Sequence, residues 1–287
     1  MLPHRIAWLF VLIPVAAYGI LFIGPLGLMA YESFNLSVPG RVTASGVLTF
    51  ANYKNLLSAG YVRYLADTFY LSLIAALVAL FVSYPAAYLI ANTANTLLRK
   101  SIIAALICYL FTSALVKVYS MVLFFGPVGF QSVLTTALSV SPNSRLWAQV
   151  VVAVGLFQAV LPIAILTLIG TLQNIPRSLG EAALSLGATR LEKHVKVIVP
   201  LAVPGLVSAF LLLFAMSISS FITPLVLGRG QVFFLTNLIY SRFSEVADFP
   251  SGAAIGVTVL AISLFVVFGV THVLTYLLSP RAVRATP

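Results

Sequence analysis

Six long apolar stretches constrain the fold of this chain more than any other feature of its sequence. They lie at about 6–30, 68–91, 102–125, 147–172, 201–227 and 253–279. About 20 apolar residues cross the hydrocarbon core of a bilayer as one α-helix, and every stretch reaches that length. The chain is 61% hydrophobic and only 8% charged, which excludes a soluble domain. We therefore predict an all-α, polytopic membrane protein with about six transmembrane helices in a single domain over residues 1–287.

Composition and motifs exclude several other classes of protein. The net charge of +10 does not indicate nucleic acid, because the basic residues are scattered between apolar stretches and form no continuous face. The single cysteine, Cys108, excludes an internal disulfide, and the three histidines lack metal-ligand spacing. The chain has no Walker A sequence, no Gly-x-Ser-x-Gly elbow and no zinc signature, and its carboxylates lie at the edges of the apolar stretches. We expect no catalytic site and no metal in this chain.

The lysines and arginines predict which side of the membrane each loop occupies. One side collects the N-terminus, the 92–101 connection, the 173–200 loop and the C-terminus, with nine basic residues: Arg5, Arg99, Lys100, Arg177, Arg190, Lys193, Lys196, Arg281 and Arg284. The opposite loops hold six basic residues: Arg41, Lys54, Arg63, Arg145, Arg229 and Arg242. Those loops are longer and also carry four acidic residues. We therefore expect both chain ends and the 173–200 loop in the cytoplasm.

The segment 181–200 is the longest charged run of the chain, and it lies between two apolar stretches. Helix formers over 179–186 predict a short helix, with Ser178 as its N-cap and Glu181 three residues later as the acidic member of a capping box. Gly187 is expected to end that helix in the left-handed conformation. A second short helix is expected over about 189–199, with Pro200 ending it. The expected result is a compact amphipathic helix-bend-helix outside the membrane.

The same run resembles the coupling motif of permease subunits of bacterial binding-protein-dependent ABC importers. That motif reads EAA, three residues, Gly, nine residues, then Ile-x-Leu-Pro. This sequence matches it at Glu181, Ala182, Ala183, Gly187 and Pro200 and has valine at 197 and 199, where Ile and Leu are usual. An EAA tripeptide alone is more often an ordinary helical turn, whereas the full spacing between two spans on a basic side favours the motif.

The resemblance implies a type I importer permease fold in the bacterial inner membrane. It implies that the 173–200 loop sits in a groove of a cytoplasmic ATPase and transmits its motion to the pore. The expected coupling residues are Glu181, Ala182, Ala183, Gly187, Arg190 and Pro200. The expected partners are two copies of the ATP-binding subunit, a second and related permease subunit, a periplasmic or extracellular substrate-binding protein, and membrane lipid, with no nucleic acid. ATP and magnesium would bind to the ATPase, and this chain would bind no cofactor.

Further segments resemble the branch of these permeases that imports spermidine and putrescine. They are Ser33-Phe34, Thr49-Phe50, Asn52-Tyr53, Thr112-Ser113 followed by Lys117 and Tyr119, and Phe221-Ile222-Thr223-Pro224. The aromatic residues usual around the basic position of the third span are partly missing, since Met121 follows Ser120. A polyamine is the expected solute, followed by amino-acid-like or phosphonate-like solutes.

Lys117 is the one charged residue well inside an apolar stretch, and such residues are candidates for function because they are costly there. A straight helix from residue 102 places it roughly 22 Å along a core of about 30 Å. One interpretation makes Lys117, with Tyr119 and Asp67, part of the translocation path. The other is a structural lysine paired with Asp67, Glu32 or carbonyl groups at a helix break. A lysine in the path does not suit a cationic solute unless a carboxylate neutralises it.

Two other functions compete with an ATP-driven importer. An ion-coupled secondary transporter of small solutes requires a carboxylate or a broken-helix ion site near mid-membrane. An intramembrane enzyme requires a nucleophile with a base, or paired carboxylates, at one depth. The sequence supplies none of these arrangements, so the permease subunit is the preferred hypothesis.

Overall fold

The computed structural model describes residues 12, 14–37, 46–127, 129–137 and 139–278. His4, Arg5, Arg41, Arg281 and Arg284 lie outside these residues, and so does most of 6–13 at the start of the first expected span. The described residues form helices without strands, apart from one isolated bridge between Asn35 and Leu48. The predicted all-α class is therefore confirmed.

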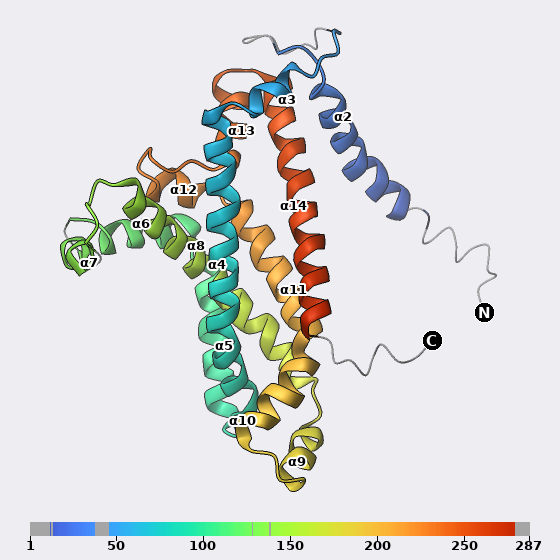
Figure 1. The fold of residues 1–287 in the computed structure, drawn as a ribbon, viewed down its shortest axis with the longest axis vertical. Coiled ribbons are helices and arrows are strands. Elements are labelled where there is room, and N and C mark those ends of the chain that lie inside the picture. The colour runs from blue at the N-terminus through green and yellow to red at the C-terminus, as the bar shows by residue number, and fades with distance from the viewer. Residues whose placement is uncertain (1–11, 13, 38–45, 128, 138, 279–287) are drawn as a thin grey trace. The chain divides into compact units, whose positions relative to one another are not determined.

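The chain divides into two compact units, which we describe separately. Unit 1 comprises Met1–Arg63 and Leu235–Ile262, and unit 2 comprises Tyr64–Phe234 and Ser263–Pro287. Two long helices, α4 (Ala59–Asn92) and α14 (Phe249–Leu278), begin in unit 1 and continue into unit 2 (Figure 1).

Unit 1 is organised around buried polar contacts at the ends of its short helices. Its other elements are η1 (Gly19–Ile23), α2 (Gly24–Glu32), α3 (Ala51–Leu56), α13 (Leu235–Tyr240) and η3 (Ser241–Glu245). The buried Asn52 amide donates to the carbonyl oxygens of Ser33 and Asn35 at 2.9 and 2.8 Å, and the Ser33 hydroxyl lies 2.6 Å from that of Tyr53. The Ser33-Phe34 and Asn52-Tyr53 segments of the sequence thus form one structural cluster.

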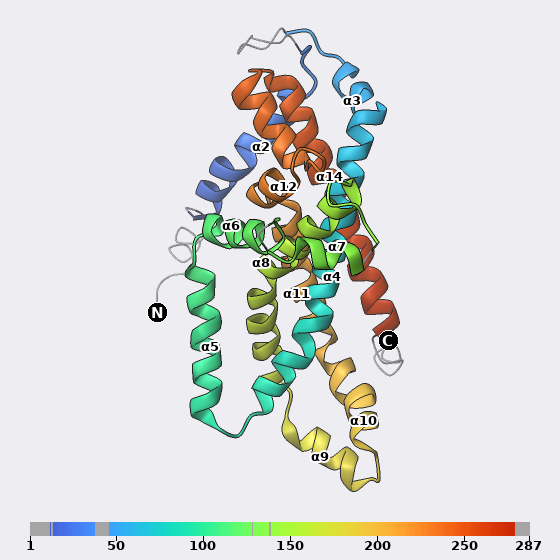
Figure 2. The same cartoon turned by 90° about the vertical axis from the view of Figure 1, so that its left-hand side faces the viewer.

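Unit 2 contains a bundle built on α8 (Arg145–Gln173) and α11 (Val199–Ile218), which pack against each other. Glycine permits their close approach, because a Cβ atom at Gly205 would collide with the side chain of Thr171. The remaining elements are α5 (Thr96–Phe111), α6 (Ala114–Phe124), α7 (Gln131–Ala137), α9 (Arg177–Ser185), α10 (Arg190–Lys193), η2 (His194–Ile198) and α12 (Ile222–Leu227). Figures 1 and 2 show α9 and α10 at the end of unit 2 where α4 ends and α5 begins.

Five helices among the described residues are long and apolar enough to cross a membrane. They are Pro14–Glu32, Gly60–Asn92, Arg145–Gln173, Arg190–Ile218 and Phe249–Val273. A sixth span arises if the bent pair Thr96–Phe111 and Ala114–Phe124 counts as one. Large apolar side chains such as Phe81 and Phe265 are exposed on these helices, as expected for surfaces in contact with lipid or other spans. The predicted number of about six spans is confirmed.

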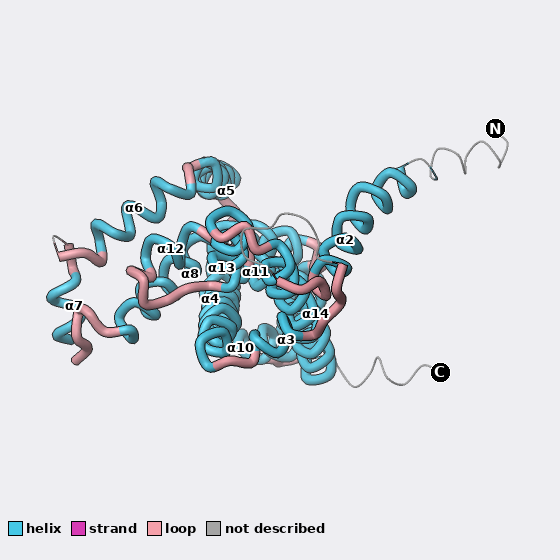
Figure 3. Tube along the Cα trace, turned by 90° about the horizontal axis from the view of Figure 1, so that it is seen from above, coloured by secondary structure: helices cyan, strands magenta, loops and turns pink. Residues whose placement is uncertain are grey.

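The third span is not the straight helix that the sequence analysis expected over 102–125. Thr112 and Ser113 adopt extended backbone conformations, with ψ of 134° and 137°, and α6 leaves α5 at an angle of 94°. Figure 3 shows α6 running away from the end of α5. The depth predicted for Lys117 is therefore wrong, because it assumed a continuous rise of 1.5 Å per residue.

The fifth span also has different bounds from those expected. Its helix begins at Arg190 instead of residue 201 and ends at Ile218, and α12 forms a separate short helix after a break. The N-terminal end of this span is thus continuous with the charged run.

Candidate functional site

The first helix of the 173–200 loop, α9, begins at Arg177 directly after Pro176. Pro176 occupies the N-cap position and no side chain caps the helix, so the predicted cap at Ser178 and capping box with Glu181 are wrong. Ser178 lies inside the first turn, where its side chain is past the N-cap position. Glu181 lies on the exposed surface, and its carbonyl oxygen accepts from the Ser185 hydroxyl at 3.1 Å.

The bend after α9 forms at Gly187 as predicted, with a φ of +87°. Gly187 N–H donates to the carbonyl of Leu184 at 3.0 Å, and Ala188 N–H donates to that of Ala183 at 3.1 Å. These two bonds are the 5→2 and 6→1 bonds of a Schellman motif, which satisfies carbonyls left open at a helix end. The spacing between the EAA residues and Gly187 thus has a local structural role: Ala183 supplies an acceptor that the bend requires.

The second helix of the loop begins with a reciprocal capping box that the sequence analysis missed. Glu192 N–H donates to Thr189 Oγ1 at 3.2 Å, and Thr189 N–H donates to Glu192 Oε2 at 3.0 Å. Lys196 Nζ donates to the other carboxylate oxygen of Glu192 at 2.7 Å. The signal was present as T-x-x-E at 189–192, immediately after the bend.

Pro200 does not end this helix, in contrast to the prediction. A π-turn over His194–Ile198 precedes it, with Val199 N–H bonded to the carbonyl of His194. In a regular α-helix the ring of Pro200 would collide with the carbonyl group four residues earlier, and the wider π-turn lies at that point. Pro200 itself occupies the first turn of α11. The charged run and the fifth span therefore form one continuous helix.

The loop is fixed to the rest of unit 2 at its base. The His194 ring packs edge-on against Tyr84 and Tyr88 of α4, with centroid distances of 5.4 and 4.5 Å. Within the loop itself, the Lys193 side chain crosses Gly180 so closely that a Cβ atom at Gly180 would collide with it. The contact between His194 and the tyrosines was not evident from the sequence, because both tyrosines lie on α4, far earlier in the chain.

The outer surface of the loop exposes apolar side chains. Leu186 at the bend is 89% exposed, Leu191 is 73% exposed and Val195 is 55% exposed, whereas Ile198 is buried. Arg190 lies beside them on the surface. Exposed apolar groups on a charged, preformed bend are typical of an interaction surface.

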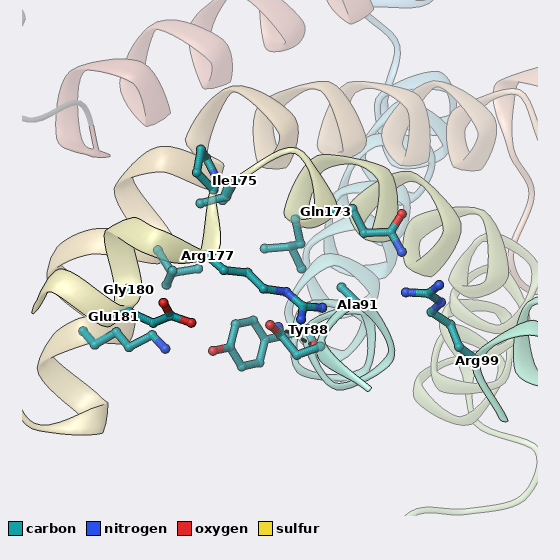
Figure 4. A pocket seen from close by; sticks show the side chains of 13 residues that line it. Tyr88, Ala91, Arg99, Gln173, Ile175, Arg177, Gly180 and Glu181 are labelled. Atoms are coloured by element: carbon teal, nitrogen blue, oxygen red, sulfur yellow. Dashed lines mark hydrogen bonds between the residues drawn. The ribbon is translucent and has the colours of Figure 1, made fainter. Parts of the chain in front are cut away.

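A cavity of about 410 Å³ lies between the 173–200 loop and the ends of neighbouring helices. Its lining comes from the ends of α4, α5 and α8 and from the loop itself: Tyr88, Ala91, Asn92, Arg99, Leu172, Gln173, Ile175, Pro176, Arg177, Gly180, Glu181, Lys193 and Ile198. Figure 4 shows the guanidinium groups of Arg99 and Arg177 directed toward the same space from opposite sides.

The three residues predicted for the translocation path do not form one cluster. Lys117 Nζ lies 3.4 Å from the carbonyl oxygen of Leu110 and 4.6 Å from the centroid of the Tyr109 ring. Asp67 is 4% exposed and accepts from Arg145 at 2.6 Å and from Gln149 at 2.9 Å. Tyr119 is 58% exposed. The partner of Lys117 in the structure is therefore a carbonyl group at a helix break. Asp67 instead pairs with Arg145.

A second cavity, of about 430 Å³, lies beside Lys117 between α6, α8 and the end of α11. Its lining includes the polar residues Gln158, Ser217 and Thr223, and Lys117 is its only charged residue among those described. The Ser217 hydroxyl is buried and has no hydrogen-bond partner within the described residues. This cavity could hold a small polar solute.

Comparison with known proteins identifies the family. The model of the binding-protein-dependent transport system inner membrane component matches residues 83–284, which include the whole 173–200 loop and four of the spans. This chain belongs to that family. The EAA loop is characteristic of the family, so the chain is an ABC importer permease and a multi-pass protein of the inner membrane.

Individual relatives agree with this assignment. The spermidine/putrescine transport system permease protein PotB of Escherichia coli is 26% identical over 249 residues, which cover 86% of this chain and 90% of PotB. The inner membrane ABC transporter permease protein YdcU of the same organism is 23% identical over 275 residues, which cover 91% of this chain and 88% of YdcU. One chain in a crystal structure of a bacterial ABC transporter involved in alginate import has a TM-score of 0.73 and 16% identity to this chain. The match covers 95% of this chain and 96% of that chain, which establishes the shared fold.

Proposed function

We propose that this permease couples solute import to a separate cytoplasmic ATPase through the 173–200 loop. The observation that carries the proposal is the preformed bend at Gly187, which holds apolar side chains such as Leu186 and Leu191 in solvent. An exposed leucine of this kind gains free energy when a partner groove covers it. The excess of basic residues near this loop supports a cytoplasmic location for it and for both chain ends.

The proposed mechanism uses the continuity between loop and span. Because the helix runs without interruption from Arg190 to Ile218, a displacement of the loop by the ATPase moves α11 as one body. Since α11 packs against α8, the fourth and fifth spans move together and open the path to the other side. Conformational changes of this kind are rigid-body motions of packed helices.

The proposed assembly contains more than this chain. One loop engages one ATPase, so two ATP-binding subunits require a second permease subunit, which we propose is a related chain. A substrate-binding protein would deliver the solute; the alginate transporter has been crystallised with a periplasmic protein bound to an alginate pentasaccharide. ATP and magnesium would bind to the ATPase subunits.

We propose a polyamine as the solute, on the basis of the spermidine and putrescine permeases among the relatives. The cavity beside Lys117, with Tyr119 nearby in the sequence, is the proposed part of the path. Since Asp67 is neutralised by Arg145, carboxylates that attract a polyamine would come from the second permease subunit.

The coupling role is tested with Leu186→Asp in the reconstituted importer. Leu186 makes no buried contact, so the variant should fold and insert but hydrolyse ATP without uptake. Leu57→Asp is the matched control, because Leu57 is 79% exposed and lies in a loop predicted on the opposite side. Unchanged uptake in Leu186→Asp would overturn the proposal. Uptake in vesicles that stops without ATP but survives an uncoupler would exclude the ion-coupled alternative.

A further inference from the structure

The cavity behind the 173–200 loop gathers more positive than negative charge. Three basic residues line it, Arg99 from α5, Arg177 from α9 and Lys193 from α10, whereas Glu181 is the only acid among the lining residues. None of the three basic side chains forms an ion pair with a carboxylate within the described residues. Side chains of like charge converge on one cavity only at a cost, which a bound anion removes.

The chemistry of the lining selects the kind of anion. Two guanidinium groups, from Arg99 and Arg177, face the same space, and guanidinium binds phosphate through paired hydrogen bonds. Asn92, Gln173 and Tyr88 add neutral hydrogen-bonding groups at the same cavity. This set suits a phosphate that carries further hydroxyl groups.

The location of the cavity selects the source of the phosphate. It lies where α4 ends at Asn92, where α5 begins at Thr96 and where α8 ends at Gln173, so three spans meet the membrane surface there. The other side of the lining is apolar and includes Leu172 and Ile198. Basic pockets between transmembrane helices on the cytoplasmic side bind the headgroups of anionic lipids.

We propose that this cavity binds the headgroup of an anionic phospholipid of the cytoplasmic leaflet. Arg177 and Lys193 belong to the loop, whereas Arg99 belongs to the third span, so one headgroup would tie the base of the loop to the membrane domain. The inference rests on the cytoplasmic location in the proposed function, but lipid binding requires no ATPase. The lipid proposal can therefore fail while the coupling role holds, and the coupling role can fail while the lipid proposal holds.

The test measures lipid retention by native mass spectrometry on the purified full chain, with phosphatidylglycerol and phosphatidylcholine as probes. We expect one tightly held phosphatidylglycerol and no such phosphatidylcholine. The double variant Arg99→Gln/Arg177→Gln should bind phosphatidylglycerol roughly thirtyfold more weakly, since each basic residue contributes about a factor of five. Lys100→Gln/Lys196→Gln removes the same charge from exposed positions outside the cavity and should leave this affinity unchanged.

Three outcomes would overturn the proposal. Equal retention of the two lipids would exclude recognition of the negative headgroup. Displacement of phosphatidylglycerol by millimolar inorganic phosphate would show a site for free phosphate. Loss of the lipid when the ATPase subunit binds would show that a protein side chain occupies the cavity in the assembled importer. Arg99→Lys/Arg177→Lys controls for misfolding, because it keeps the charge and should retain most of the binding.

Discussion

Lys117 and the carbonyl oxygen of Leu110 lie 3.4 Å apart across the bend between α5 and α6. The bend leaves carbonyl groups at the end of α5 without helical partners, and in an apolar environment each such group is costly. A lysine seven positions later satisfies one of them. The cation is therefore held at the helix break, at the edge of the cavity that we assign to the path.

Lys117→Gln separates the two classes of solute. A fixed cation repels a polyamine, so removing the charge should leave spermidine uptake unchanged or raise it several-fold. Uptake of radiolabelled spermidine by the reconstituted importer measures this, with Lys117→Arg as the control that keeps the charge. Loss of uptake in Lys117→Gln but not in Lys117→Arg would instead indicate an anionic solute.

Asp67→Asn should destabilise the protein, because it removes the negative partner of Arg145 from a site that is 4% exposed. Breaking a buried ion pair costs about 3–5 kcal/mol, and the partly exposed Arg145 side chain reduces this to about 1–3 kcal/mol. Thermal unfolding in detergent measures the loss. Lys196→Gln, which breaks an exposed pair with Glu192, is the control and should leave the melting temperature almost unchanged, because solvent screens this pair.

Gly187→Ala tests the backbone of the bend. The space around Gly187 is open, so any loss comes from its φ of +87° alone and should be about 1–2 kcal/mol locally. We expect faster proteolysis of the 173–200 loop and less uptake per ATP hydrolysed. Gly170→Ala in α8 also meets open space but lies in a regular helix, and it should be neutral or stabilising by up to about 1 kcal/mol. Similar effects of the two substitutions would contradict this account.

Thr189→Ala should expose the amides at the start of α10, because the hydroxyl accepts from Glu192 N–H. The expected cost is about 1 kcal/mol. Hydrogen exchange at residues 190–193 should accelerate accordingly. Ser178→Ala is the matched control, since no side chain caps α9, and exchange at the start of that helix should not change. A larger effect of Ser178→Ala would restore the capping box expected at Ser178 and Glu181.

The sequence by itself determined the features that depend on neighbouring residues. Apolar length located the spans, and the positive φ at Gly187 followed from the need for a residue without a side chain at the end of α9. The spacing from Glu181 to Pro200 indicated the family before any comparison. The T-x-x-E capping box at Thr189 was also present in the sequence, but we predicted a capping box at Ser178 instead.

Only the tertiary structure decided the features that depend on direction and on distant partners. Hydropathy sums over a window and does not register a change of direction, so the 94° bend at Thr112 and Ser113 was hidden inside one apolar stretch. The partner of Asp67 is 78 positions away, and the tyrosines that hold His194 lie on another helix. The π-turn before Pro200 joins loop and span because packing on both sides stabilises a helix that local propensity alone would end.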